Sequence, residues 1–152
     1  MASGLAGPVA IEITQLIPAP IDEVWRRITD WERLGDWMLE ASDFVVLSDQ
    51  REGVGVEAEA TVRIAGITTR DKVRVSVWEP PRRLVIDHLG WVSGSGDMAL
   101  VPYGAETFLY WREELVPPLG ALGRLGLLTF APVMKRIFAR DAKILASLAG
   151  QM

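Results

Sequence analysis

The chain has 152 residues, the size of one ordinary domain, and its mixture of 49% hydrophobic and 24% charged residues excludes a disordered protein. The net charge of −4 argues against a nucleic-acid-binding protein, which needs a basic face to replace counterions along the phosphate backbone. There is no cysteine and only one histidine, so the composition excludes disulfides, thiolate chemistry and a multi-histidine zinc or iron centre.

The sequence shows no targeting or membrane-spanning pattern. Residues 1–8 lack the basic start and long apolar run of a signal peptide. The most apolar stretch, residues 119–134, is interrupted by Arg124, three glycines and Pro132, and is too broken to cross a bilayer. We therefore expect a cytoplasmic protein without stable membrane insertion, folded as a single domain over residues 1–152 with a core at about 9–149. The absence of asparagine and the excess of arginine over lysine are typical of a GC-rich bacterial genome.

The first third of the chain predicts a strand followed by two helices. Residues 9–17 alternate apolar and polar side chains, which is typical of a half-buried strand. Pro20 suits the first turn of a helix, and apolar residues follow at helical spacing up to Ile28. Asp30 is placed to cap a second short helix that extends to Trp37.

From Phe44 onward the apolar period changes to two, which predicts consecutive strands with short turns and hence an antiparallel meander. The strands are expected at residues 56–64, around 73–77, and at 83–90, 94–101 and 106–115, with Pro80-Pro81 ending the second of these. Residues 132–149 carry an apolar stripe at helical spacing and predict a long C-terminal helix. The order is therefore a strand, two helices, five or six strands and a long helix.

This order predicts an α+β fold in which a curved antiparallel sheet wraps around the long C-terminal helix, the helix-grip arrangement. A single helix cannot fill the concave face of a strongly curved sheet unless the facing side chains are large. Several inward positions are small here, namely Ala58, Ala60 and Gly96. We therefore expect an internal apolar cavity.

Three segments resemble the START-like (SRPBCC) superfamily, and within it the polyketide cyclase/dehydrase and lipid-transport family. The first is IPAPIDEVWRRITDWERLGDW at residues 17–37, the second is VWEPPRRL at 77–84, and the third, weaker one is GAET at 104–107 before a strand with Trp111. The resemblance covers roughly residues 9–149 and implies the helix-grip fold with a partly hollow core. It implies function only broadly, because this fold hosts lipid carriers, aromatase/cyclases, hydrolase-like enzymes and partner-binding regulators.

Two stretches match a dinucleotide-binding fingerprint in spacing: Gly53-x-Gly55-x-x-Ala58 and Gly94-x-Gly96-x-x-Ala99. That motif requires a strand before it and a helix after it, whereas both stretches run into strand patterns. We interpret the first pair of glycines as a flexible loop at the cavity mouth and the second as a site of sheet curvature or a bulge. No nucleotide or metal cofactor is expected.

The candidate catalytic residues are His88 and Glu113, each with two interpretations. His88 would enter the cavity if it shares the face of Leu84 and Ile86, but a single histidine is more often structural. Glu113 is in phase with Trp111 on an apolar face, or else lies at the wet end of its strand. Tyr110 is a third polar candidate.

Eleven residues are the expected ligand-binding wall, although large apolar residues at such spacing are also typical of an ordinary core: Trp37, Met38, Val62, Val75, Ile86, His88, Met98, Trp111, Phe130, Met134 and Phe138. The leading hypothesis is a protein that binds a lipid, polyketide or similar hydrophobic metabolite. The alternative is a cyclase, aromatase or dehydratase, and it would be favoured if His88 and Glu113 both point inward within about 8 Å of each other. A third is a regulator that binds a protein partner, or forms a homodimer, through the Leu-rich residues 119–128. The connector at residues 119–130 has three interpretations: a mobile flap over the cavity entrance, an apolar patch that meets a membrane surface or partner, or an ordinary amphipathic turn of helix packed on the sheet.

Overall fold

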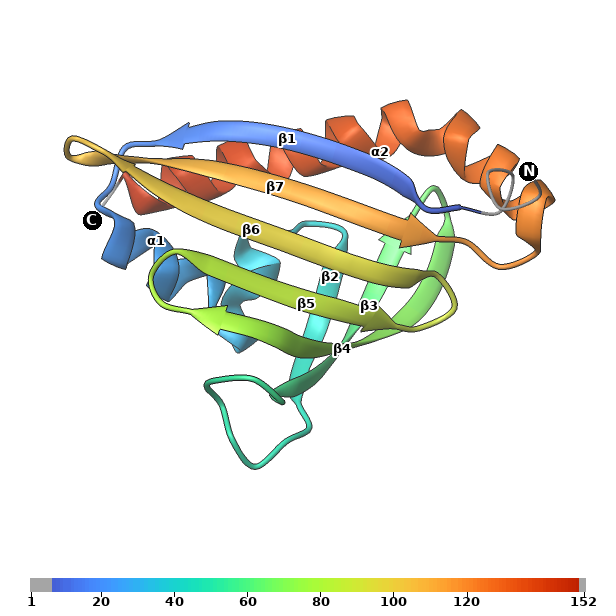
Figure 1. The fold of residues 1–152 in the computed structure, drawn as a ribbon, viewed down its shortest axis with the longest axis horizontal. Helices are drawn as coiled ribbons and strands as arrows, with labels where there is room; N and C mark the ends of the chain where they lie inside the picture. The colour runs from blue at the N-terminus through green and yellow to red at the C-terminus, as the bar shows by residue number, and fades with distance from the viewer. Residues whose placement is uncertain (1–6, 151–152) are drawn as a thin grey trace.

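A seven-stranded antiparallel sheet curves around a long C-terminal helix in the computed structural model, which describes residues 7–150 (Figure 1). The sheet order is β1-β7-β6-β5-β4-β3-β2, so the first strand pairs with the last and the remaining strands form a meander. The elements are β1 (Val9–Ile17), α1 (Ile21–Ile28), the 3-10 helix η2 (Trp31–Asp36), β2 (Ala41–Val46), β3 (Glu57–Ile64), β4 (Ile67–Glu79), β5 (Arg83–Leu89), β6 (Ser93–Tyr103), β7 (Glu106–Val116) and α2 (Gly120–Ala149). The predicted α+β helix-grip fold is confirmed, with six strands after the two short helices.

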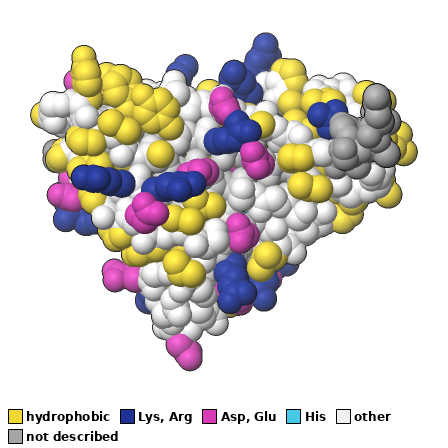
Figure 2. Space-filling model, in the orientation of Figure 1, with side chains coloured by type: hydrophobic (Ala, Val, Ile, Leu, Met, Phe, Trp, Pro, Cys, Tyr) yellow, Lys and Arg dark blue, Asp and Glu magenta, His cyan; other side chains and the backbone are white. Residues whose placement is uncertain are grey.

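The alternation of the strands gives the sheet an inner face toward α2 and an outer face toward solvent. On β7, Leu109, Trp111 and Glu113 are buried, while Tyr110 and Arg112 between them are exposed. Figure 2 views the outer face, where basic and acidic side chains lie interspersed and ion pairs such as Arg83–Asp97, at 2.9 Å, link neighbouring strands. The inner face is therefore the one that shapes any internal site.

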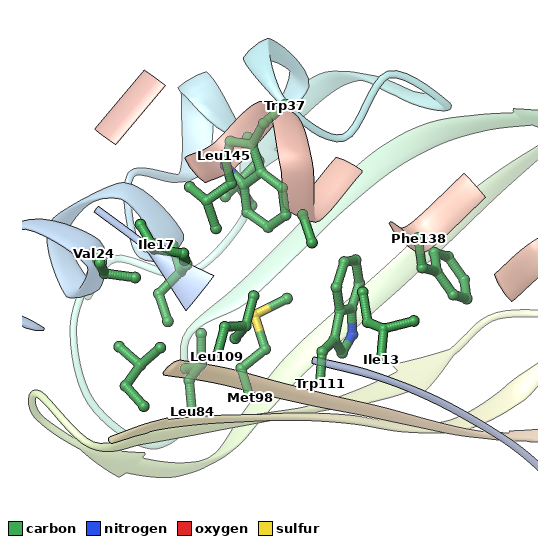
Figure 3. Packing of buried hydrophobic residues seen from close by; sticks show 14 of the residues in the cluster. Ile13, Ile17, Val24, Trp37, Leu84, Met98, Leu109, Trp111, Phe138 and Leu145 are labelled. Atoms are coloured by element: carbon green, nitrogen blue, oxygen red, sulfur yellow. The ribbon is translucent and has the colours of Figure 1, made fainter. Parts of the chain in front are cut away.

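Aromatic side chains join the sheet to the helices at the centre of the molecule. Trp111 of β7 lies against Phe138 of α2, with ring centroids 5.1 Å apart, and Trp37 meets it edge-on at 6.0 Å (Figure 3). Leu109 and Leu145 are fully buried beside this group. Such contacts fix α2 across the concave face, since each large side chain contributes on the order of 2 kcal/mol through burial.

The C-terminal helix is longer than predicted, because it begins at Gly120 and passes through Pro132. Proline removes one backbone hydrogen bond from a helix interior, which is why the sequence favoured a start at residue 132. The preceding segment is rich in leucine and alanine, which are strong helix formers, and so it continues as helix. The Leu-rich residues 119–128 are therefore mainly the first turns of α2.

Three smaller predictions are wrong. Asp30 makes no capping side-chain hydrogen bond at the start of η2. Of the two roles expected for Gly94 and Gly96, the bulge is absent, because the strand pairing continues through both without a shift and the irregularity lies between Val75 and Val77 on β4; their part in sheet curvature stays a prediction. The β2–β3 loop at residues 47–56, which carries Gly53, projects from the sheet and contributes no residue to the cavity described below. None of the helices within residues 7–150 is both long and apolar enough to cross a membrane.

Candidate functional site

The inner face of the sheet, η2 and α2 line a cavity of about 390 Å³, which is open to solvent on the side of the exposed Ile67 and Trp91. Its wall is mostly aliphatic and aromatic, and the small inward residues Ala58, Ala60 and Gly96 border it. A larger side chain at any of these positions would occupy part of the space. The volume is within the usual range for sites that bind small molecules.

Nine of the eleven predicted wall residues border this cavity: Met38, Val62, Ile86, His88, Met98, Trp111, Phe130, Met134 and Phe138. The other two, Trp37 and Val75, are buried in the packed core and do not border it. Both side chains point into the interior, as expected, but other side chains separate them from the cavity. The apolar pattern of a single element cannot reveal such a separation. Contact of any of these residues with a ligand stays a prediction.

His88 lies at the cavity wall between two carboxylates. Its Nδ1 is 2.9 Å from Asp71 Oδ2 on β4, and its Nε2 is 2.8 Å from Glu113 Oε2 on β7. Trp111 Nε1 donates a hydrogen bond to the other oxygen of Glu113 at 2.8 Å. The Glu113 residue is only 5% exposed, and all four residues border the cavity. We call Asp71, His88 and Glu113 the histidine–carboxylate cluster.

Two glycines on β6 allow this cluster to join residues of β4, β5 and β7 across β6. His88 on β5 is paired with Gly94, and Glu113 on β7 is paired with Gly96, so no side chain of β6 stands between the two. A Cβ atom at Gly96 would lie 2.5 Å from Glu113 Oε1. Gly94 has φ of +127°, and a Cβ there would lie 1.8 Å from the Glu114 carbonyl oxygen, so this position also requires glycine.

The carboxylates hold the His88 imidazole in its protonated form. Burial alone would lower the pKa of His88, but the hydrogen bonds and negative charges of Asp71 and Glu113 outweigh burial and raise that pKa to about 10. At neutral pH the imidazolium therefore donates one N–H to each carboxylate. The cluster then has one positive and two negative groups.

A second group of carboxyls lies where the loop before β2 meets α2. Glu40 borders the cavity, and Arg140 Nη2 lies 3.2 Å from Glu40 Oε2 and 2.9 Å from Asp141 Oδ1. Asp141 is fully buried, and its Oδ2 has no hydrogen-bond partner among the described residues. Burial, with a contribution from Asp141, raises the pKa of Glu40 to about 8, and Arg140 only partly offsets this. Glu40 is therefore protonated over much of the neutral range and can donate a hydrogen bond.

Sequence reasoning missed Asp71 and Glu40. Asp71 could have been found, because it is in phase with Val73 on β4 and so faces the cavity. Glu40 has no such signal, since it precedes β2 in a loop without periodicity. Tyr110, offered as a polar candidate, is 46% exposed on the outer face and does not border the cavity.

The arrangement supplies groups for proton transfer and hydrogen bonding inside an apolar space. Within residues 7–150, no group of three or more His, Asp or Glu side chains is placed to hold a metal ion. His88 and Glu113 meet the condition that favours an enzyme, because both border the cavity and are hydrogen-bonded to each other. Low polarity around such groups strengthens their electrostatic effect on a bound molecule.

Comparisons with known proteins agree with this architecture. The aromatase/cyclase ZhuI from Streptomyces sp. R1128 is 19% identical, with a TM-score of 0.79 and 93% of each chain covered. A START superfamily protein from Mycobacterium smegmatis is 16% identical, with a TM-score of 0.69 over 95% of this chain and 97% of its own. At such identities these likenesses show the fold alone. Curated protein sequences gave no match.

The family comparison covers nearly the whole chain. The model of the family described as "Polyketide cyclase / dehydrase and lipid transport" matches residues 8–150. This agrees with the three segments that carry the resemblance in the sequence and with the fold shared with these two solved structures. The chain belongs to the family of polyketide cyclases/dehydrases and lipid-transport proteins.

Proposed function

We propose that this protein binds a hydrophobic small molecule in the cavity between the sheet and α2. The observation that carries the proposal is the cavity of about 390 Å³ with a mostly apolar wall. Each square ångström of apolar ligand surface removed from water contributes roughly 25 cal/mol, so a ligand of this size gains several kcal/mol from burial alone. The few polar side chains of the wall would orient it.

The family description and the aromatase/cyclase neighbours support a polyketide or lipid as the type of ligand. A di-domain aromatase/cyclase from the steffimycin biosynthetic pathway shares the fold at a TM-score of 0.73 and 14% identity, with this chain spanning 50% of its length. Binding and chemistry on such a molecule need the same pocket. The wall of this protein therefore fits either role.

A cavity-filling variant tests the binding function. Ala60 borders the cavity, so Ala60→Phe should lower the affinity for the neutral fluorescent probe Nile red by at least about tenfold, because the new ring occupies the site. Ala10→Phe is the matched control, since Ala10 is exposed on β1. Equal affinity of both variants and the wild type, with unchanged near-ultraviolet circular dichroism, would contradict binding in this cavity.

The histidine–carboxylate cluster favours a second candidate function, acid–base catalysis of a dehydration or cyclisation. Glu113 would take the proton from the carbon next to a carbonyl group, while its hydrogen bonds with His88 and Trp111 hold the carboxylate in position. Glu40, protonated near neutral pH, would give its proton to the leaving hydroxyl group, so that water and an enone are released. Both carboxyls border the same cavity.

A β-hydroxy ketone distinguishes this candidate from simple binding. The wild type should convert 4-hydroxydecan-2-one to the conjugated enone, followed by its ultraviolet absorbance. Glu113→Gln should slow the reaction by about 100-fold, the usual contribution of one general base. Glu114→Gln changes the adjacent residue on the outer face and should have no effect. No acceleration by the wild type would leave binding as the function.

A further inference from the structure

The charges around the cavity indicate which ligands it accepts. We propose that the bound molecule is uncharged or cationic at its polar end, and that carboxylate and phosphate ligands, including free fatty acids, are rejected. This inference rests on the proposed binding function and specifies the class of ligand. It follows from the identity and pairing of the ionisable side chains that border the cavity.

All but one of the ionisable side chains that border the cavity are carboxyls. They are Glu40, Glu59, Asp71 and Glu113, and the exception is His88. No lysine or arginine within residues 7–150 borders it. A pocket built for an anionic head group would be expected to offer an arginine or lysine, or several backbone N–H groups, to it.

The nearby cations are already engaged by these carboxyls. Both ring nitrogens of His88 are hydrogen-bonded to the carboxylates of Asp71 and Glu113, so neither N–H is directed at a ligand. Outside the wall, Arg140 bridges Glu40 and the buried Asp141. The histidine–carboxylate cluster thus has one positive side chain against two carboxyls, and in the second group Arg140 already faces Asp141 beside a Glu40 that is protonated over much of the neutral range.

The remaining acidic group of the wall is also paired outside the cavity. Arg70 donates hydrogen bonds to Glu59 and lies largely in solvent. A ligand anion would therefore lie in an apolar space beside the histidine–carboxylate cluster, and no lysine or arginine on the wall within residues 7–150 would balance it. The apolar surroundings screen charges weakly, so the carboxylates repel an anionic ligand strongly. The same carboxylates attract an ammonium group or a neutral hydrogen-bond donor.

Matched ligands test the inference on the wild-type protein. Decanoate, decanamide and decylammonium share one alkyl chain, and decanamide has nearly the shape of decanoate without its charge. Binding at pH 7.5 can be followed by isothermal titration calorimetry and by the fluorescence of Trp31 and Trp111, which border the cavity. We expect decanamide and decylammonium to bind at least about tenfold more tightly than decanoate.

A charge-removing variant links the preference to the wall. Glu113→Gln should reduce the preference for decanamide over decanoate by at least about threefold. Glu114→Gln, on the outer face, should leave it unchanged. Because the comparison of ligands uses the wild type, it does not depend on the folding of any variant.

The outcomes separate this inference from the proposed function. Decanoate binding as tightly as decanamide would overturn the inference and leave the binding function intact. Failure of all three ligands to bind, with Nile red also unbound, would overturn the binding function and the inference with it. Weaker binding of decanoate than of decanamide by the wild type, together with a smaller difference between the two ligands in Glu113→Gln, would support the binding function and the inference.

Discussion

His88 is the only histidine of the chain, and its surroundings determine the charge of the cavity. It is 15% exposed in its side chain, and each ring nitrogen contacts a carboxylate. Removing one partner from a buried ion pair usually costs on the order of 3 kcal/mol, because the remaining charge is left without compensation. The cluster is thus both a structural support and the polar centre of the candidate site.

A nuclear magnetic resonance titration of the single imidazole should give a midpoint near pH 10, because Asp71 and Glu113 stabilise the protonated ring. The untagged protein contains no other histidine signal, so the assignment is direct. Glu113→Gln should lower the midpoint. A midpoint near 6.5 in the wild type would contradict the geometry of the cluster.

The same pKa shift predicts a dependence of stability on pH. The pKa of His88 rises from 6.5 in the unfolded chain to about 10 in the folded protein, so protonation favours the folded state. Its contribution to the free energy of unfolding is complete below pH 6.5 and is lost as the pH rises through 10. The stability difference between the wild type and His88→Gln should therefore shrink from pH 6 to pH 10 in urea unfolding.

At the scale of elements, α2 covers the cavity and begins earlier than its sequence suggests. Two glycines in its first turns have different surroundings. A Cβ at Gly123 would lie 1.7 Å from the Pro118 carbonyl oxygen, whereas a Cβ at Gly126 would have no atom within 4 Å. Substitutions at Gly126 therefore test whether this segment is helical, and substitutions at Gly123 test how closely it packs against Pro118.

Gly126→Ala should raise the free energy of unfolding by roughly 0.5–1 kcal/mol, because alanine is the better helix former and the position is open. Gly123→Ala should lower it by at least about 1 kcal/mol, since the backbone of Pro118 must move. Denaturant unfolding of the two variants measures both effects. Equal effects would show that residues 120–126 are not held as this helix.

The strands were more predictable than the helix start. Alternation along β7 placed Trp111 and Glu113 on one face, and the structure puts both at the cavity. The same rule would have found Asp71, but it cannot show that glycines on β6 let Glu113 reach across to His88. Such a contact depends on strand order and register, which no single strand encodes.

At the scale of the molecule, the cavity results from a curved sheet held away from one helix. Aromatic residues such as Trp37 fill part of the interior (Figure 3). Ala58 and Ala60 border the open part. Small inward residues pointed to a hollow, but the sequence could not specify its volume or the position of Glu40 on its wall. Loops and helix placement decide both.

Native mass spectrometry of the protein mixed with decanamide tests the central claim most directly. The binding account predicts a one-to-one adduct in the wild type that is lost on denaturation, and a greatly reduced adduct in Ala60→Phe. An adduct of endogenous origin, displaced by decanamide, would also reveal the mass of the natural ligand. A bare mass for the wild type at saturating decanamide, alongside an unchanged fold, would contradict the account.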